Sequence, residues 1–498
     1  MTGRTKTTAG IVEISAETGT LLERLRIKGY SLRADCGGQG ICGVCRIRFF
    51  SSPPDPDPIE YQHFSEQELN LGWRLACRHD EPCAVQIEFD PDWENDFRIE
   101  SVKPNALLAF EDVGFAVDIG TTGLVAALVN FELGVPILIA RGFNPQRVWG
   151  ADVMTRLVAA RDENSLVLMK QAILKAIASA QRKLLATVDN AGKPRISAML
   201  AVGNTVMVHL ATGMAEETLS VFPFRSPLED VKLIALDGNY RIAGPLQGYV
   251  GSDLLAVLEF LRLHENSDFP TLVMDLGTNS EIALWDGERY WVTSCAAGPA
   301  FEGGGISCGA PALPGVATGV RRRGKTWELL PAAEKPKNGL CGSALIALLA
   351  ELVQSGDLQY DGKLVSGDSV FLQKKPALKL MQKDIRGLQL AKGALCAGIH
   401  AIANRAGFGI SSINEVIVTG AFARDLHAGD LKRIGLVPAA ARSVRFVNDG
   451  ALWGAARALS CAEESFDTIR ERVKVINLAE EADFQEFFLA GLILKPME

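Results

Sequence analysis

Apolar and polar residues alternate in short runs over the first ninety residues, which predicts strands around one helix. Residues 11–15 alternate as a strand does, and residues 20–29 carry apolar side chains at helical spacing and end on a glycine. Two more strands are predicted at 45–50 and 84–89, with a short helix between them. We therefore expect a small α+β domain over residues 1–92.

The pattern changes after this first domain. Residues 93–113 mix charged and apolar positions without a period, and we interpret them as a short linker. From residue 114 to the end, apolar strands, glycine turns and long amphipathic helices alternate, which is typical of an α/β domain.

One internal similarity organises this large domain. The segment FAVDIGTTGLVAAL at 115–128 resembles LVMDLGTNSEIAL at 272–284. Each is an apolar strand followed by Asp, an apolar residue, Gly and Thr, and then by a second apolar strand. Duplication at about one domain length predicts two similar lobes, at about 114–270 and 271–498, that face each other across a cleft.

Charge and composition exclude several classes of protein. The 51 basic and 59 acidic residues give a net charge of −8, whereas a nucleic-acid binder usually has a basic excess. No run of 18 apolar residues is uninterrupted, and the first residues lack the apolar core of a signal peptide. We expect a cytoplasmic protein without nucleic-acid or membrane partners, whose ten cysteines are not a disulfide framework.

Five cysteines fall within one early segment, which suggests a metal site. The run Cys36-x5-Cys42-x2-Cys45 lies in the glycine-rich loop DCGGQGICGVC, and Cys77 follows after a long gap. This spacing resembles 2Fe–2S ferredoxins of the adrenodoxin type, in which glycines let the backbone approach the cluster. Cys77 lies in a segment like the ferredoxin RLAC motif, so we choose it as the fourth ligand over Cys83. The alternative is a structural zinc site, although zinc sites usually pair two short knuckles.

Both copies of the repeat are candidate phosphate loops. Their turns can present backbone N–H groups to an anion, while Asp118 and Asp275 can orient Mg²⁺ through water. The segment EVIVTGAFARDL at 415–426 is a third apolar strand followed by Thr419 and another glycine turn. The predicted cofactor-binding residues of these three turns are Gly120, Thr121, Thr122, Gly277, Thr278, Asn279, Gly420, Ala421 and Phe422.

Three other polar residues have two interpretations each. Asn204 lies beside the nucleotide or makes an ordinary Gly-Asn-Thr turn. Glu281 orients the hydrolytic water or ends a strand, and we include it with the two aspartates as a catalytic candidate. Asp152 orients a base or caps its helix, and we favour the cap.

The order of the three turns resembles that of the acetate and sugar kinase, heat-shock ATPase and actin superfamily. The resemblance implies an α+β ferredoxin domain of the β-grasp type, followed by a duplicated α/β ATPase of two ribonuclease-H-like halves that close on ATP. Fused in this way, the chain resembles the reductive activators of corrinoid proteins. Long segments match that family's pattern over nearly the whole chain, among them NPQRVWGADVMTRL, AAGPAFEGGGISCG and LAKGALCAGI.

The family resemblance implies ATP-dependent, one-electron reduction of a corrinoid protein from Co(II) to Co(I). The implied cofactors are a 2Fe–2S cluster, ATP and Mg²⁺, and the implied partners are a corrinoid protein of a methyltransferase system and an external low-potential electron donor. A homodimer is left open. The alternatives are an ATPase-coupled donor to another low-potential enzyme, a small-molecule kinase, and a zinc-bearing, chaperone-like ATPase. The chain departs from the family in having only a short stretch where an additional linker domain is usual.

Overall fold

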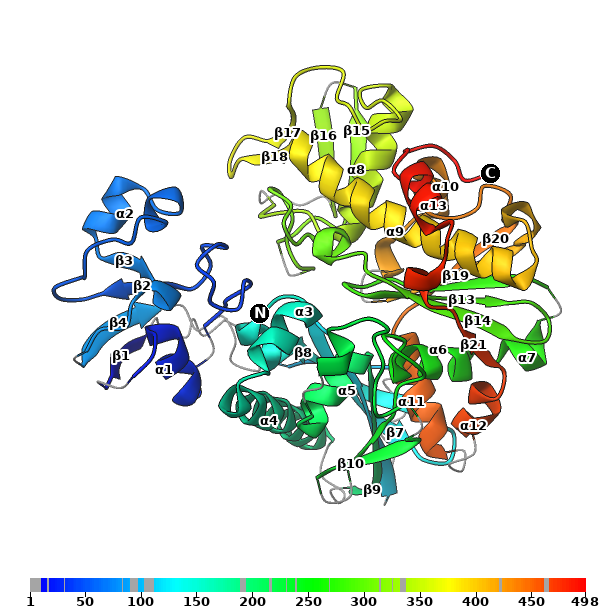
Figure 1. Ribbon diagram of the computed structural model, residues 1–498, viewed down its shortest axis with the longest axis horizontal. Coiled ribbons are helices and arrows are strands. Elements are labelled where there is room, and N and C mark those ends of the chain that lie inside the picture. The colour runs from blue at the N-terminus through cyan, green and yellow to red at the C-terminus, as the bar shows by residue number, and fades with distance from the viewer. Residues whose placement is uncertain are drawn as a thin grey trace.

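The computed structural model describes residues 10–15, 18–30, 32–82, 84–89, 97–102, 112–188, 194–214, 217–229, 231–237, 240–267, 269–312, 315–324, 326–331, 337–420, 423–460 and 465–498. Figure 1 shows a small N-terminal domain beside a larger body of two lobes, each built on its own sheet. Along the described chain, none of the helices is both long enough and apolar enough to cross a lipid bilayer.

The N-terminal domain is a four-stranded sheet, in the order β1-β4-β2-β3, with its own hydrophobic core. Leu21, Leu22 and Leu25 of the first helix pack against Ile47 and Ile87 of the sheet. Thr20 begins this helix with a capping box, and Gly29 follows its end at φ +81°, as the sequence predicts. The elements are β1 (Gly10–Ile14), α1 (Leu21–Ile27), β2 (Arg46–Phe49), α2 (Glu66–Asn70), β3 (Trp73–Leu75) and β4 (Val85–Phe89).

Lobe 1 is a seven-stranded sheet in the order β10-β11-β9-β6-β7-β8-β5. Its strands are β5 (Arg98–Ser101), β6 (Asp112–Ile119), β7 (Gly123–Asn130), β8 (Val135–Phe143), β9 (Arg195–Gly203), β10 (Leu233–Asp237) and β11 (Tyr240–Ala243). Its helices are α3 (Val153–Ala159), α4 (Glu163–Thr187), α5 (Thr205–Thr212), α6 (Ser252–Leu261) and α7 (Leu263–Asn266).

Lobe 2 is a six-stranded sheet in the order β20-β19-β12-β13-β14-β21, with two added hairpins. Its sheet strands are β12 (Thr271–Asp275), β13 (Ser280–Trp285), β14 (Tyr290–Cys295), β19 (Glu415–Thr419), β20 (Ser443–Val447) and β21 (Val473–Val475). The hairpins are β15 (Gly319–Arg323) with β16 (Thr326–Leu330), and β17 (Ser369–Gln373) with β18 (Leu378–Met381). The remaining helices are α8 (Gly342–Ser355), α9 (Gln382–Ala406), α10 (Ala428–Ile434), α11 (Gly450–Ser460), α12 (Ser465–Arg470) and α13 (Phe484–Gly491).

The two sheets repeat one topology, which confirms the predicted duplication. In lobe 1, β6 pairs antiparallel with β7 and parallel with β9. In lobe 2, β12 pairs antiparallel with β13 and parallel with β19. Each central strand therefore delivers its aspartate, Asp118 or Asp275, to a hairpin turn at the same edge of its sheet.

The lobes share a layer of two helices. α6 and α11 pack against each other between the sheets, and one apolar cluster joins Ala116 and Val202 of lobe 1 to Val273 and Ile417 of lobe 2. A Cβ at Gly454 of α11 would overlap the Ala256 carbonyl oxygen of α6, so the helices cross at backbone contact. Helix α11, from the C-terminal part of the chain, also contacts β6 to β9 of lobe 1, so the two lobes are joined by more than the chain near residue 270.

The stretch expected as a linker contains a strand. Residues Arg98–Ser101 form β5, which pairs antiparallel with β8 at the edge of the lobe 1 sheet, and Phe97 is buried in the lobe 1 core. The short linker predicted over 93–113 therefore includes an edge strand, which the sequence did not indicate because pairing at a sheet edge requires no periodic apolar pattern.

Candidate functional site

The four predicted cysteine ligands lie in two pairs. The Sγ atoms of Cys45 and Cys77 are 3.3 Å apart, and the thiols of Cys36 and Cys42 are hydrogen-bonded to each other. The first pair is buried, whereas Cys36 and Cys42 are partly exposed. The second pair therefore forms the accessible edge of the site.

Backbone amides of the glycine-rich loop point at the thiols. The N–H groups of Gly38 and Gly40 are hydrogen-bonded to the sulfurs of Cys36 and Cys77. Gly38 has φ +107° and Gly40 has φ +81°, conformations that other residues rarely adopt. Burial opposes ionisation of Cys36, yet the hydrogen bonds to the Cys42 backbone and side chain and to the loop amides lower its pKa to about 7. The amides of the loop thus stabilise negative charge on the sulfurs of Cys36 and Cys77, whereas burial raises the pKa of Cys42 to about 11.

This donor set fits a 2Fe–2S cluster better than one zinc ion. A tetrahedral zinc site needs four ligands around one point. Within the described ranges, no three His, Cys, Asp or Glu side chains converge closely enough to hold a single metal ion. A 2Fe–2S cluster has two irons, each with two protein ligands, and two separate cysteine pairs match that requirement.

The first phosphate loop, Gly120–Thr122, is held from behind by three side chains. Asn144 Nδ2 donates to the Gly120 carbonyl oxygen at 2.7 Å, and the buried Arg156 Nη2 donates to that of Thr121 at 2.6 Å. Asn204 Nδ2 donates to Thr121 Oγ1 at 2.9 Å. Since the N–H of a trans peptide points opposite to its C=O, these contacts turn the amides of the loop away from the lobe interior.

Asn204 also caps helix α5, because its side-chain oxygen accepts from the Met207 amide at 3.0 Å. It therefore caps a helix and supports the phosphate loop, and its place beside the nucleotide stays a prediction. Asp152 caps α3 by accepting from the Thr155 amide at 2.9 Å, as favoured from the sequence.

The second phosphate loop and the third turn lie against each other. The Leu276 amide donates to the Thr419 carbonyl at 2.9 Å, and a Cβ at Gly420 would overlap the Leu276 carbonyl oxygen. With φ +117°, Gly420 is the residue that permits this close approach. Gly277 and Thr278 form the turn between β12 and β13, while Asn279 is partly exposed. Ala421 and Phe422 lie outside the described residues.

Acidic side chains gather near the two loops. Burial raises the pKa of Asp275 to about 7, with a smaller contribution from Asp253, and raises that of Asp253 itself to about 6. Burial and the neighbouring Asp253, Asp275 and Asp449 hold the pKa of Asp118 well above its usual range. These carboxyls are close enough to repel one another once ionised.

Glu281 belongs to the same group. It lies opposite Asp275 in the antiparallel register of β12 and β13, and burial and its acidic neighbours hold its pKa well above its usual range. It is 2% exposed, and its Oε1 has no hydrogen-bond partner among the described residues. This burial leaves it little access to an attacking water.

Sequence reasoning missed two residues of this region. Asp253 enters the acidic group from the start of α6, and the signal was the Gly-Ser-Asp run that opens that helix. Glu302 bridges the lobes: its Oε2 accepts from Thr122 Oγ1 at 2.6 Å and from Thr278 Oγ1 at 2.9 Å. Glu302 lies within the segment AAGPAFEGGGISCG that matches the family pattern, but its bridging contacts could not be predicted because its partners are distant in sequence.

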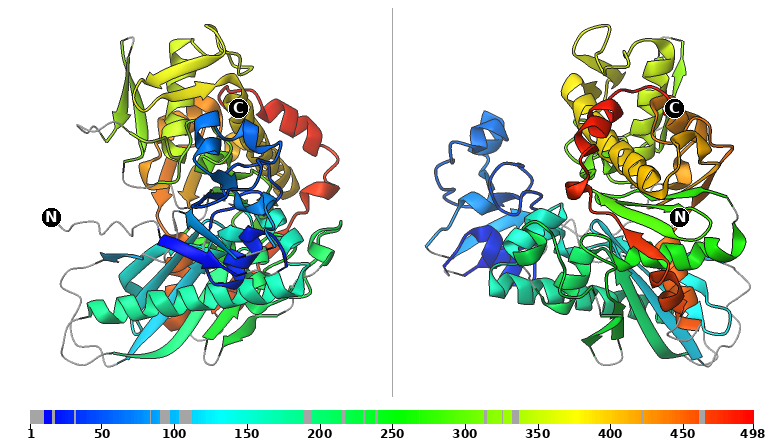
Figure 2. Two further views of the ribbon diagram at one scale, coloured as in Figure 1. Left: turned by 90° about the vertical axis from the view of Figure 1, so that its left-hand side faces the viewer. Right: turned by 45° about the vertical axis from the view of Figure 1, so that its right-hand side comes forward.

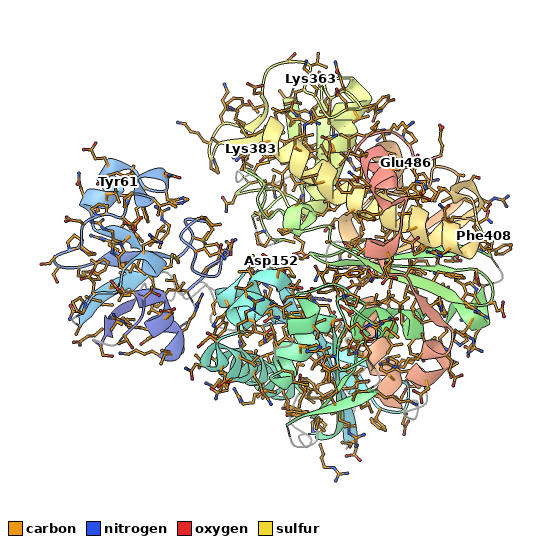
Figure 3. The ribbon with its side chains drawn as sticks, in the orientation of Figure 1. Tyr61, Asp152, Lys363, Lys383, Phe408 and Glu486 are labelled. Carbon is orange, nitrogen blue, oxygen red and sulfur yellow. The ribbon has the colours of Figure 1, made fainter. Side chains whose placement is uncertain are left out.

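The cysteine loop contacts lobe 1 directly. The Ala151 amide donates to the Asp35 carbonyl at 3.0 Å, and Arg26 of α1 donates to the Val148 carbonyl. The Arg26 guanidinium carbon is also 5.7 Å from the centre of the Trp149 ring. Figures 1 and 2 show the small domain beside α3 and α4, and Figure 3 places Asp152, the α3 cap, near this junction.

Comparison with known proteins identifies all three parts of the chain. Residues 7–79 match the family model of a 2Fe–2S iron–sulfur cluster binding domain. Residues 113–266 match the RACo middle region, and residues 270–498 match the C-terminal domain of RACo, described as the ASKHA domain. Fold and site thus define an iron–sulfur ATPase, in which a ferredoxin domain precedes a duplicated ATPase of the actin and sugar-kinase type.

The chain belongs to the RACo family, the reductive activators of corrinoid proteins. It is 29% identical over 417 residues to the corrinoid activation enzyme RamQ of Eubacterium limosum, covering 76% of this chain and 69% of that protein. It is 28% identical over 273 residues to a [Co(II) methylated amine-specific corrinoid protein] reductase of Methanosarcina barkeri, covering 49% of each.

A solved structure described as a reductive activator for corrinoid, iron–sulfur protein shares the fold. It aligns with a TM-score of 0.67 and 22% identity, over 98% of this chain and 97% of that one. The predicted fold class, a ferredoxin domain followed by an actin-like ATPase, is therefore confirmed.

Proposed function

We propose that this protein uses ATP to return a partner corrinoid protein from Co(II) to Co(I), and that it delivers one electron in each event. Its family membership supports this activity, as does its similarity to two relatives, a corrinoid activation enzyme and a corrinoid protein reductase. A 2Fe–2S cluster bound by Cys36, Cys42, Cys45 and Cys77 supplies one-electron transfer at low potential. An external low-potential donor provides the electron.

One observation carries the proposal: a single segment of lobe 1 contacts both the cysteine loop and the phosphate loop. In this segment, the Val148 carbonyl accepts from Arg26 of α1, and the Ala151 amide donates to the Asp35 carbonyl of the cysteine loop. A few residues further on, Arg156 Nε donates to the Gly150 carbonyl at 2.9 Å and its Nη2 holds Thr121. A short series of hydrogen bonds therefore connects the cysteine loop to the first phosphate loop.

The energetics explain why such a protein needs ATP. Plant-type ferredoxins operate near about −400 mV. If the cobalt couple lies on the order of 120 mV lower, transfer is uphill by roughly 2.8 kcal/mol, since about 59 mV is tenfold for one electron. ATP can offset this only by favouring one conformation of the complex over another. Closure of the two lobes on the nucleotide, which the resemblance to actin-like ATPases implies, is a conformational change of this kind.

We further propose that the nucleotide binds with Mg²⁺. Asp118, Asp253 and Asp275 lie together beside the phosphate loops, and burial raises the pKa of each. A divalent cation that reaches them through its water shell would favour the ionised carboxylates and neutralise the phosphates.

The test is anaerobic reduction of a purified Co(II) corrinoid protein, followed by cobalt absorbance. We expect formation of Co(I) only with reduced protein, ATP and Mg²⁺ together. Protein with Cys77→Ser and protein with Asp275→Asn serve as the redox-deficient and nucleotide-deficient controls. Equal Co(I) formation without ATP, or by either control variant, would refute the proposal.

A further inference from the structure

The most informative unassigned contact is the bridge made by Glu302. This residue ends the short helical turn Pro299–Glu302, and the next residue, Gly303, has φ +85°. Phe301 and Ala300 of this turn are buried, and the Gly304 amide donates to the Pro299 carbonyl at 2.8 Å. The carboxylate is therefore presented from a rigid turn.

Both hydroxyls that Glu302 accepts from belong to phosphate loops of opposite lobes. With ATP bound, hydroxyls of such loops donate to phosphoryl oxygens. A carboxylate within hydrogen-bond distance of both hydroxyls consequently lies next to the phosphates. Two anions do not approach each other directly, but a water molecule between them can donate to the carboxylate and present a lone pair to phosphorus.

The other carboxyls are less suited to this task. Glu281 is almost inaccessible in the β12–β13 pair. Asp118 and Asp275 have raised pKa values through burial, and they lie in the acidic group that a cation would occupy. Glu302 is the partly exposed carboxylate that contacts both loops.

We propose that Glu302 orients and deprotonates the water that attacks the terminal phosphate of ATP. The water oxygen forms a bond to the γ-phosphorus as its proton passes to a Glu302 carboxylate oxygen. The bond from the γ-phosphorus to the β–γ bridging oxygen breaks, and ADP leaves with that electron pair. The inference rests on the nucleotide half of the proposed function and is independent of the electron acceptor.

The test separates hydrolysis from binding. Single-turnover ATP hydrolysis and the Kd of a non-hydrolysable ATP analogue are measured for full-length wild type, Glu302→Gln, Glu302→Asp and Glu288→Gln. Glu288 is an exposed carboxylate in the turn between β13 and β14 and is the matched control. We expect Glu302→Gln to hydrolyse ATP about 100-fold or more slowly, in the range of lost general-base catalysis, while the analogue Kd stays within about 3-fold.

One further readout distinguishes a proton acceptor from a structural residue. Glu302→Asp keeps the carboxylate and should recover part of the hydrolysis rate. Hydrolysis at the wild-type rate in Glu302→Gln would overturn the proposal. So would tighter analogue binding with unchanged hydrolysis, since Glu302 would then only compete with phosphate for the two hydroxyls. Failure to reduce corrinoid while ATP hydrolysis follows the expected pattern would count against the proposed function alone.

Discussion

Arg26 should control how firmly the ferredoxin domain is docked on lobe 1. It donates to the Val148 carbonyl and lies over the Trp149 ring, so Arg26→Ala removes a charge-assisted hydrogen bond and a cation–π contact. These contribute about 1.5–3 kcal/mol and about 0.5–2 kcal/mol respectively. Burial lowers the pKa of Arg26 to about 10, which shows that docking costs the guanidinium hydration. We therefore take the low end, about 2 kcal/mol, or roughly a 30-fold shift in the docking equilibrium.

The assay is hydrogen exchange at the Ala151 amide, which donates to the Asp35 carbonyl across the junction. Arg26→Ala should speed its exchange about 30-fold, because opening of the junction exposes this amide. Lys28→Ala is the matched control. Lys28 is an exposed basic residue two positions after Arg26, and its side chain donates to the Glu13 carbonyl within the ferredoxin domain. Unchanged exchange in Arg26→Ala, or equal acceleration in Lys28→Ala, would refute a role of Arg26 in docking the ferredoxin domain on lobe 1.

Other predictions concern the two sites. Cys77→Ser should abolish the visible absorbance of the reconstituted cluster while ATP binding persists; normal absorbance would exclude Cys77 as a ligand. Asp275→Asn should keep the cluster spectrum but lower ATP-dependent Co(I) formation by about 100-fold or more, which the cobalt assay measures. Gly420→Ala should weaken ATP-analogue binding at least about 10-fold, because its Cβ would overlap a carbonyl of the second phosphate loop, whereas Gly429→Ala has open space and should bind normally. The nucleotide-free protein should melt at higher temperature at pH 6 than at pH 8. The folded pKa of Asp275 is about 7 against about 3.9 unfolded, so the folded state binds more protons in this window and stability falls as pH rises; Asp275→Asn should flatten this slope.

Local pattern was sufficient where function depends on short segments. The cysteine spacing led us to choose four thiols, and the structure places these four in two pairs. The repeated strand–Asp–turn segments predicted the duplicated sheets. Both patterns lie within a few consecutive residues, so they can be recognised from sequence. The cap at Asp152 followed from the same local rules.

Long-range contacts were not predictable in this way. Glu302 accepts a hydrogen bond from Thr122, which is 180 residues away in sequence, and Arg26 donates to the Val148 carbonyl, which is 122 residues away. Strand β5 was missed because an edge strand in a charged segment has no alternating signature. The burial of Glu281, a catalytic candidate that could equally end a strand, was not predictable because it depends on the β12–β13 register and on the packing around it.

The helix pair α6 and α11 has a consequence for how the molecule comes apart. Its apolar cluster takes residues from both ATPase sheets, whereas the ferredoxin domain keeps a core of its own. Unfolding of either lobe would therefore expose apolar residues of the other lobe to water. Calorimetry should therefore resolve two cooperative melting units in this chain, the ferredoxin and the whole ATPase, although the latter descends from two copies of one sheet.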